Sequence, residues 1–284
     1  MRLQRRQMKG VALIAVLWLV AAMGLIISGI VHSVRNELRA AGTQRQTLVA
    51  GAQADAAILL ALQYLSAQPI PPGAALQYLS VQFEGQTLRV TIQPLNGLID
   101  INNASPQLLA DLYQYAGGLT PEAAQALAVA TESTRKFKDE GAAPEGFDAI
   151  EDLFRVPTMT YTVYAKLKNL ITASVREGSG RVNPMASPLG VLQILVGGNT
   201  PRAVAFVARR EKDPNTMDTS FLKSDQIQTE ASRSMRLEVP ILLPDGNVSI
   251  KSWDIFWGKD PRSSLPWRVL NTQQTTQQPS QANY

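Results

Sequence analysis

The first 67 residues carry one continuous helical pattern with two different surfaces. Residues 11–31 form an unbroken apolar run in which Ser28 is the only strongly polar member. At 1.5 Å per residue, a helix of this length just crosses the hydrocarbon core of a bilayer. Residues 34–67 contain no proline and are rich in helix formers, above all alanine. We therefore expect one helix over residues 11–67, about 85 Å long, with a membrane span at 11–31.

The second half of this helix has its own apolar pattern. Apolar residues recur at steps of three or four, which predicts a stripe along one face of a solvated helix. The members of this stripe are Val49, Ala52, Ala56, Leu59 and Leu62. The helix should end before Pro69, Pro71, Pro72 and Gly73, because proline cannot continue it.

Alternating segments near both ends of the remaining chain predict β-hairpins. Residues 79–83 and 87–92 surround Glu84-Gly85-Gln86, and residues 235–243 and 247–256 flank Pro244-Asp245-Gly246. A further strand is expected at 267–270. Strands at both ends with helical sequence between them predict an α+β fold, in which an antiparallel sheet is interrupted by a large insertion.

These patterns divide the chain into segments. We assign residues 68–94 and 235–270 to the sheet and residues 95–230 to an inserted helical domain. Residues 1–10 precede the long helix as a leader. Residues 271–284 are rich in glutamine and have little to bury, so they are expected to be disordered.

The inserted segment contains a weak internal repeat. "ASPQLLADLYQYAGGLTPEAA" (104–124) is echoed by "ASPLGVLQILVGGNTPRAV" (186–204). In each copy the serine should cap a helix that starts at the proline, the glycine pair should end it, and the threonine should cap the next helix. The residues concerned are Ser105, Pro106, Gly117, Gly118 and Thr120, and Ser187, Pro188, Gly197, Gly198 and Thr200. Each copy is thus predicted to be a helix–hairpin–helix.

Charge argues against nucleic acid as the partner of these units. The formal net charge is +4, but four of the 27 basic residues precede the apolar run, which leaves 23 against 23 acidic residues. Residues 99–130 have no lysine or arginine, and DNA affinity depends on such cations. Arg202, Arg209 and Arg210 in the second copy fit a solvated helix face. We expect protein contacts, with a membrane-anchored DNA-binding or DNA-uptake protein as the alternative.

The composition removes most catalytic chemistry. The sequence has no cysteine and one histidine, His32, at the edge of the apolar run. Thiol nucleophiles, zinc–thiolate sites and a Ser-His-Asp arrangement are therefore excluded within this sequence. No phosphate-binding GxxxxGK[ST] loop occurs. We expect no enzyme activity and no catalytic residues; an exported enzyme held by a signal anchor is a further alternative.

The leader and its junction with the apolar run resemble a type IV prepilin-like signal. Arg2, Arg5, Arg6 and Lys9 should stay in the cytoplasm, and the chain after residue 31 should be exported. The resemblance, carried by "MKGVALIAVLWLV", implies cleavage between Gly10 and Val11 by prepilin peptidase and N-methylation of Val11. An ordinary signal has a shorter apolar region, and an uncleaved signal anchor is the plainer alternative.

Nearly the whole chain resembles the K-type minor pseudopilins of the type II secretion system. The segments that carry the likeness are "KGVALIAVLWLV", "GLIDINNASPQLL", "IEDLFRVPTMTYTVYAKLKNLIT", "GRVNPMASPLGVLQIL" and "PWRVL". The resemblance implies a pseudopilin fold with an inserted helical domain and a single-pass inner-membrane protein with a periplasmic C-terminal domain. It also implies I- and J-type minor pseudopilins and the major pseudopilin as partners, and a place at the pseudopilus tip.

Two positions depart from the family pattern. Most pilin-like subunits carry glutamate fifth from the cut, where this sequence has Ala15. The family also has an acidic run associated with calcium, whereas the carboxylates here lack the tight alternating spacing of a calcium loop. These are Asp139, Glu140, Glu145, Asp148, Glu151 and Asp152. We assign no metal ligand and no cofactor, with calcium at Asp139–Asp152 as the alternative.

Overall fold

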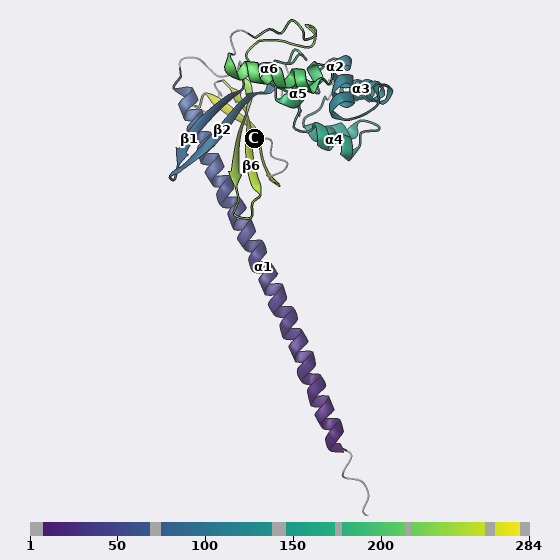
Figure 1. Cartoon of the computed structure of the whole chain (residues 1–284), viewed down its shortest axis with the longest axis vertical. Helices are drawn as coiled ribbons and strands as arrows, with labels where there is room; N and C mark the ends of the chain where they lie inside the picture. The colour runs from purple at the N-terminus through teal and green to yellow at the C-terminus, as the bar shows by residue number, and fades with distance from the viewer. Residues whose placement is uncertain are drawn as a thin grey trace, which may run out of the picture.

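A single long helix leads into a mixed α and β body in the computed structural model of the protein (Figure 1). The structure describes residues 8–68, 75–137, 146–173, 178–213, 217–258 and 265–278. Helix α1 (Met8–Ser66) is continuous, so the prediction of one helix over 11–67 is confirmed. The expected stop signals at Pro69, Pro71, Pro72 and Gly73 lie outside the described residues, as does the leader before Met8.

The sheet has five antiparallel strands in the order β1-β2-β5-β6-β7. Their bounds are β1 (Gln77–Phe83), β2 (Gln86–Pro94), β5 (Ser234–Leu242), β6 (Val248–Trp257) and β7 (Trp267–Gln277). Both predicted hairpins, β1–β2 and β5–β6, are confirmed. Gly85 and Gly246 adopt φ of +76° and +85°, a left-handed conformation that glycine accepts without strain.

The predicted disordered tail is wrong over its first half. Strand β7 continues to Gln277 and pairs with β6 from Trp267 onward. Gln274 Nε2 also donates to the main-chain oxygen of Thr47 in α1 at 2.9 Å. Composition misled the prediction because main-chain hydrogen bonds to β6, rather than buried side chains, hold this segment. Residues 279–284, the rest of the predicted tail, lie outside the described residues.

The face of α1 that packs on the sheet is not the predicted stripe. The buried positions are mostly alanines: Ala50, Ala54, Ala57, Ile58, Ala61, Leu62 and Leu65. They form one apolar core with inward-facing residues of β2, β5 and β6. Of the predicted stripe only Leu62 takes part, whereas Val49 and Leu59 are 50% and 47% exposed. Small side chains let the helix lie close to the sheet, which hydrophobicity alone does not indicate.

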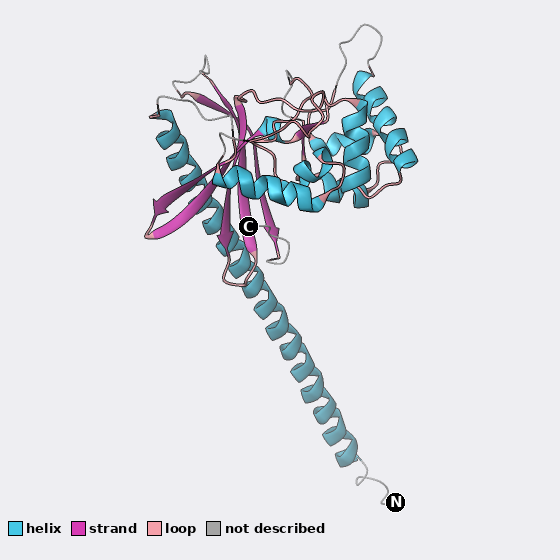
Figure 2. Ribbon diagram, turned by 45° about the horizontal axis from the view of Figure 1, so that its top comes forward, coloured by secondary structure: helices cyan, strands magenta, loops and turns pink. Residues whose placement is uncertain are grey.

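A helical insertion separates β2 from β5, although these strands are neighbours in the sheet. It has its own apolar core and lies to one side of the sheet (Figure 2). Its helices are α2 (Pro106–Asp111), α3 (Pro121–Lys136), α4 (Tyr161–Leu167), α5 (Leu189–Leu195) and α6 (Thr200–Lys212). Shorter elements are η1 (Leu95–Gly97), η2 (Leu112–Ala116), η3 (Ile150–Arg155) and a parallel pair, β3 (Ile99–Asp100) with β4 (Ile171–Thr172).

The two repeat copies form helix pairs, α2 with α3 and α5 with α6, but their caps differ. In the first copy Ser105 and Thr120 accept hydrogen bonds from Leu108 N and Ala123 N, as predicted. In the second copy the predicted caps are wrong. Ser187 is buried and donates to Asn183 O at 2.8 Å, and Asn199 caps α6 in place of Thr200. The asparagine one residue earlier accepts from Arg202 N and so displaces the threonine.

Candidate functional site

The three residues singled out for processing and assembly lie near the start of α1. Gly10 and Val11 fall within its first turn and a half, and Ala15 follows about one turn later with its side chain exposed. This end of the helix stands away from the sheet and the insertion (Figure 2). Residues of the stretch Leu13–Leu25 that the structure describes are exposed, including Trp18 at 73%.

Within the described residues, α1 is the helix long and apolar enough to cross a membrane. Its apolar residues fall in two stretches. The first is Leu13–Leu25, and the second lies within His32–Ser66, where 44% of the most apolar window is buried in the protein. Burial against the sheet already accounts for the second stretch. The first has no such partner among the described residues, and the fold of the chain does not account for its exposed apolar surface.

A second apolar face runs along α1 opposite the sheet. We call Leu38, Leu48, Val49, Leu59 and Leu60 the outer stripe. Leu38, Val49 and Leu60 are 11 residues apart, close to three helical turns, and so share a face. Their exposed fractions are 68%, 50% and 38%. This surface includes two members of the stripe predicted from the sequence, Val49 and Leu59, and the described residues do not cover it.

Polar contacts fix the orientation of α1 on the sheet, and hence the direction in which the outer stripe points. Asp55 accepts a hydrogen bond from Trp253 Nε1 at 2.8 Å, and its Oδ1 lies 3.5 Å from Lys251 Nζ. Gln274 packs against Gly51, where a Cβ would lie 2.6 Å from the glutamine Oε1. These contacts therefore fix the rotation of α1 about its own axis relative to the sheet.

The "GLIDINNAS" segment ties the insertion together. Asp100 accepts from Asn102 N at 3.0 Å and from Asn103 Nδ2, and Asn102 bonds the main chain of Phe147 in both directions. Burial raises the pKa of the Asp100 carboxyl from 3.8 to about 6, although these hydrogen bonds and the charge of Arg135 act to lower it. All these polar groups bond within the protein, so the segment has a structural role.

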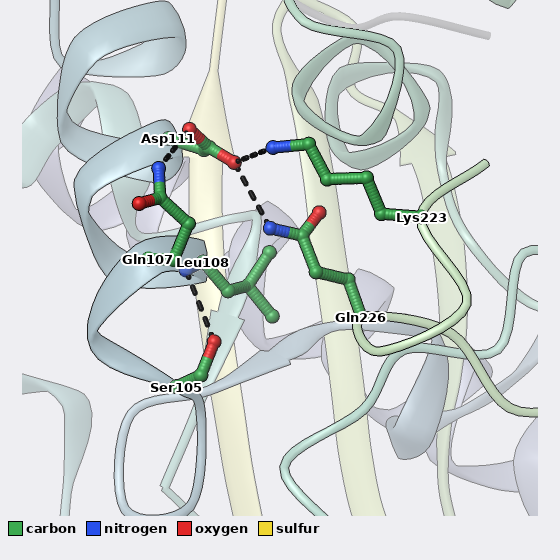
Figure 3. A network of polar contacts seen from close by, with 6 residues as sticks. All are labelled: Ser105, Gln107, Leu108, Asp111, Lys223 and Gln226. Carbon is green, nitrogen blue, oxygen red and sulfur yellow. Dashed lines mark hydrogen bonds and ion pairs between the residues drawn. The ribbon is translucent and has the colours of Figure 1, made fainter.

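A second polar network joins α2 to the chain that follows α6 (Figure 3). Asp111 Oδ2 accepts from Lys223 Nζ and Gln226 Nε2, both at 3.0 Å, and Oδ1 accepts from Gln107 Nε2 at 3.0 Å. Asp111 and Gln226 are buried, whereas the Lys223 side chain is 53% exposed. The carboxylate thus joins segments more than 100 residues apart in the sequence.

The acidic stretch gives no metal site in the part that the structure describes. Asp139, Glu140 and Glu145 lie outside the described residues. Asp152 accepts from the main-chain nitrogens of Asp148 and Ala149 at the start of η3, and Glu151 accepts from Tyr164 Oη at 3.0 Å. Among described residues, no group of three or more carboxylates or histidines is placed to hold a metal ion.

The arginines of the second helical unit do not form one solvated cationic face. Arg210 is buried and donates through Nη1 to the main-chain oxygens of Pro184 and Ser187 at 2.8 and 2.7 Å. Arg202 lies over the Phe221 ring, 4.4 Å from its centroid. Arg209 is exposed. The expectation of a solvated face is therefore wrong for Arg210, which is used to bind carbonyls of its own domain.

A cavity of about 1270 Å³ lies where the insertion meets the sheet, at a place that no sequence pattern indicates. Its sheet side carries Arg236 and Asp254, paired through two hydrogen bonds of 2.6 and 2.8 Å. Glu238 is next to them on the same face of β5, and burial raises the pKa of its carboxyl. Alternation within the predicted strands placed Arg236 and Glu238 on one face, but the pairing with Asp254 depends on strand register.

The arrangement as a whole has exposed apolar surface along α1, which is long and apolar enough to cross a membrane. Most polar groups of the described clusters bond within the chain, whereas Gln226 Oε1 has no partner among the described residues. No family model matches the chain, and no curated protein shows a significant match to it.

Proposed function

We propose that this protein is a membrane-anchored structural subunit of a secretion pseudopilus, a minor pseudopilin of the K type. The observation that carries the proposal is α1 itself. One helix of 59 residues joins an exposed apolar N-terminal stretch to a half that packs on an antiparallel sheet. The start of this helix holds the Lys9-Gly10 junction, where the prepilin-like signal places the cut.

In this proposal the N-terminus faces the cytoplasm, the apolar stretch lies in the inner membrane, and the sheet and insertion are periplasmic. Prepilin peptidase cuts between Gly10 and Val11, and the new terminus is methylated. The outer stripe supports assembly, because an exposed apolar face beside a membrane anchor is suited to packing on helices of other subunits. Those subunits are the I- and J-type minor pseudopilins and the major pseudopilin. The protein itself performs no catalysis and binds no nucleic acid.

Ala15 supports a position at the tip. Glutamate in hydrocarbon costs several kcal/mol unless it is paired, and in pilin-like filaments its partner is taken to be the amine of the preceding subunit. A subunit with alanine at this position makes no such bond to a predecessor. The positively charged amine of its own Val11 can still form an ion pair with the glutamate carboxylate of the next subunit. Such a subunit fits the first position of the filament.

Processing tests the proposal most directly. The protein is purified from membranes of cells with active prepilin peptidase, and its mass and first residue are determined. We expect a chain that begins at methylated Val11, and an uncut precursor when Gly10 is replaced by leucine. An intact Met1 terminus in the wild-type protein would refute the proposal.

Assembly is tested with a matched pair on α1. Leu59 is 47% exposed on the outer stripe, whereas Leu62 is fully buried against the sheet. Leu59→Ala should weaken crosslinking to partner subunits and leave unfolding unchanged, because surface truncations cost about 0.5 kcal/mol or less. Leu62→Ala should destabilise the fold by about 2–5 kcal/mol. Equal crosslinking of the wild type and Leu59→Ala would refute a role of the outer stripe in assembly.

A further inference from the structure

The outer edge of β7 is open over most of its length. β7 is the last strand of the sheet, and in the described part of the chain only β6 pairs with it. Residues 268–273 are exposed, and residues 269–277 contain no charge, proline or glycine. Proteins commonly protect such an edge with lysine, proline or a very short strand. β7 has no lysine or proline and is eleven residues long, although its pairing with β6 is interrupted by a bulge at Leu270. On the C-terminal side of this bulge, the main-chain groups of residues 271–277 are available to a further strand.

The cavity lies beside this edge. Arg268, Asn271 and Gln273 of β7 line it, on the same sheet face as Arg236 and Asp254. Because alternate side chains of a strand share a face, a strand added next to β7 would place every second side chain over the cavity. The main-chain edge and the side-chain cavity would therefore be used by one occupant.

Charge indicates what that occupant carries. Arg233 and Arg268 line the same end of the cavity, since Ser234 pairs with Phe256 and Phe256 with Arg268. Asp254 neutralises Arg236, but no described carboxylate lies within 4.0 Å of the Arg233 or Arg268 guanidinium.

The acidic residues of the cavity other than Asp254 lie outside the strands of the sheet. Asp148 and Glu151 belong to the insertion, and Glu151 is bonded to Tyr164. Glu230 lies on the chain that leads into β5, and its carboxylate is not within 4.0 Å of the Arg233 or Arg268 guanidinium. The two arginines thus leave positive charge at one end of the sheet side of the cavity.

We propose that the β7 edge and the cavity form a docking site for an extended segment of another protein. The segment adds to the sheet beside β7, and one of its carboxylate side chains lies against Arg268 and Arg233. Main-chain pairing supplies affinity, while the cavity and the two arginines select the side chains. This inference does not depend on the proposed function, because a pseudopilin and any other anchored protein would use the edge in the same way.

Peptide binding tests the site on the full-length protein in detergent micelles. The probes are two fluorescent decapeptides that alternate threonine and valine and differ in one residue, glutamate or lysine. Fluorescence anisotropy should give saturable binding of the glutamate peptide, about tenfold tighter than the lysine peptide. Arg268→Glu should reverse this preference, and Arg268→Gln should abolish it. Arg89→Glu, a charge reversal on β2 near the opposite edge of the sheet, should leave it unchanged.

Hydrogen exchange locates the bound peptide. The glutamate peptide should slow exchange of amides in β7 and leave those in β1 unchanged. Four results would overturn the proposal: no saturable binding, equal affinity for both peptides, an unchanged preference in Arg268→Glu and Arg268→Gln, or protection of β1. Protection of β7 that rises with protein concentration in the absence of peptide would also overturn it, because a second copy would then be the occupant.

Discussion

Replacing Asp111 with alanine should open the inserted domain without disturbing the sheet. The carboxylate accepts three hydrogen bonds, from Gln107, Lys223 and Gln226. The bond from Gln226 matters most, because its amide is buried and its Oε1 has no partner among the described residues. After the substitution, the nitrogen of that amide also lacks a partner.

The cost can be estimated contact by contact. Leaving the Gln226 nitrogen unpaired costs about 1–3 kcal/mol. The contact with half-exposed Lys223 contributes about 1 kcal/mol at most, and the Gln107 contact within α2 about 0.2–0.5 kcal/mol. The total is about 1–4.5 kcal/mol, or roughly a 5- to 2000-fold rise in the open population. Lys223→Met should cost less than about 1 kcal/mol.

Native-state hydrogen exchange measured by mass spectrometry is the suitable assay, because it reports opening separately for each segment. Protection of α2 and α3 should fall in Asp111→Ala, while β5 and β6 keep wild-type protection as an internal control. The insertion and the sheet have separate apolar cores, which makes this separation possible. If Lys223→Met lowered protection as much as Asp111→Ala, the exposed ion pair would be the important contact and the reasoning from burial would be wrong.

Two further predictions concern the segment that leads into the insertion. Gly97→Ala should destabilise the folded protein by about 1–3 kcal/mol, because the added Cβ would lie 2.3 Å from Ala186 O. Gly42→Ala, in the exposed part of α1, should stabilise it by up to about 1 kcal/mol. Thermal unfolding of the two variants and the wild type measures both effects. The raised pKa of Asp100, about 6 against 3.8, means that the folded state holds this proton more tightly. Stability should therefore fall by up to about 3 kcal/mol as pH rises from 4 to 6, and Asp100→Asn should remove this part of the slope in urea titrations. If the unfolding free energy of Asp100→Asn fell with pH as steeply as that of the wild type, this pH dependence would not come from Asp100.

Elements specified by local chemistry could be predicted from the sequence. Both hairpins turn where a glycine must adopt positive φ, at Gly85 and Gly246. In the repeat, α2 begins at Pro106 and α5 directly after Pro188. A glycine pair follows the first helix of each copy, and Gly118, Gly197 and Gly198 adopt the left-handed conformation. In each case the decisive residues lie within a few positions of the feature that they produce.

Features that depend on distant partners could not be predicted. The segment after residue 270 has a disordered composition, yet β6 provides a row of main-chain partners for it. Arg210 has the sequence context of a solvated helix, yet the carbonyls that it binds come from the turn at 184–187. The cavity exists only because the insertion returns beside the sheet. A sequence pattern contains no information on these contacts until strand order and register are known.

The two faces of α1 explain why the predicted stripe does not coincide with the face that packs on the sheet. Hydropathy ranks leucine and valine above alanine, so the sequence signal follows the outer stripe, where Val49 and Leu59 lie. The buried face relies on alanine because a helix that approaches a sheet closely gains contact area from small side chains. The stronger hydrophobic pattern on this helix thus lies on the face that the proposed function assigns to other subunits, whereas the weaker one packs on the sheet and determines the fold of the chain.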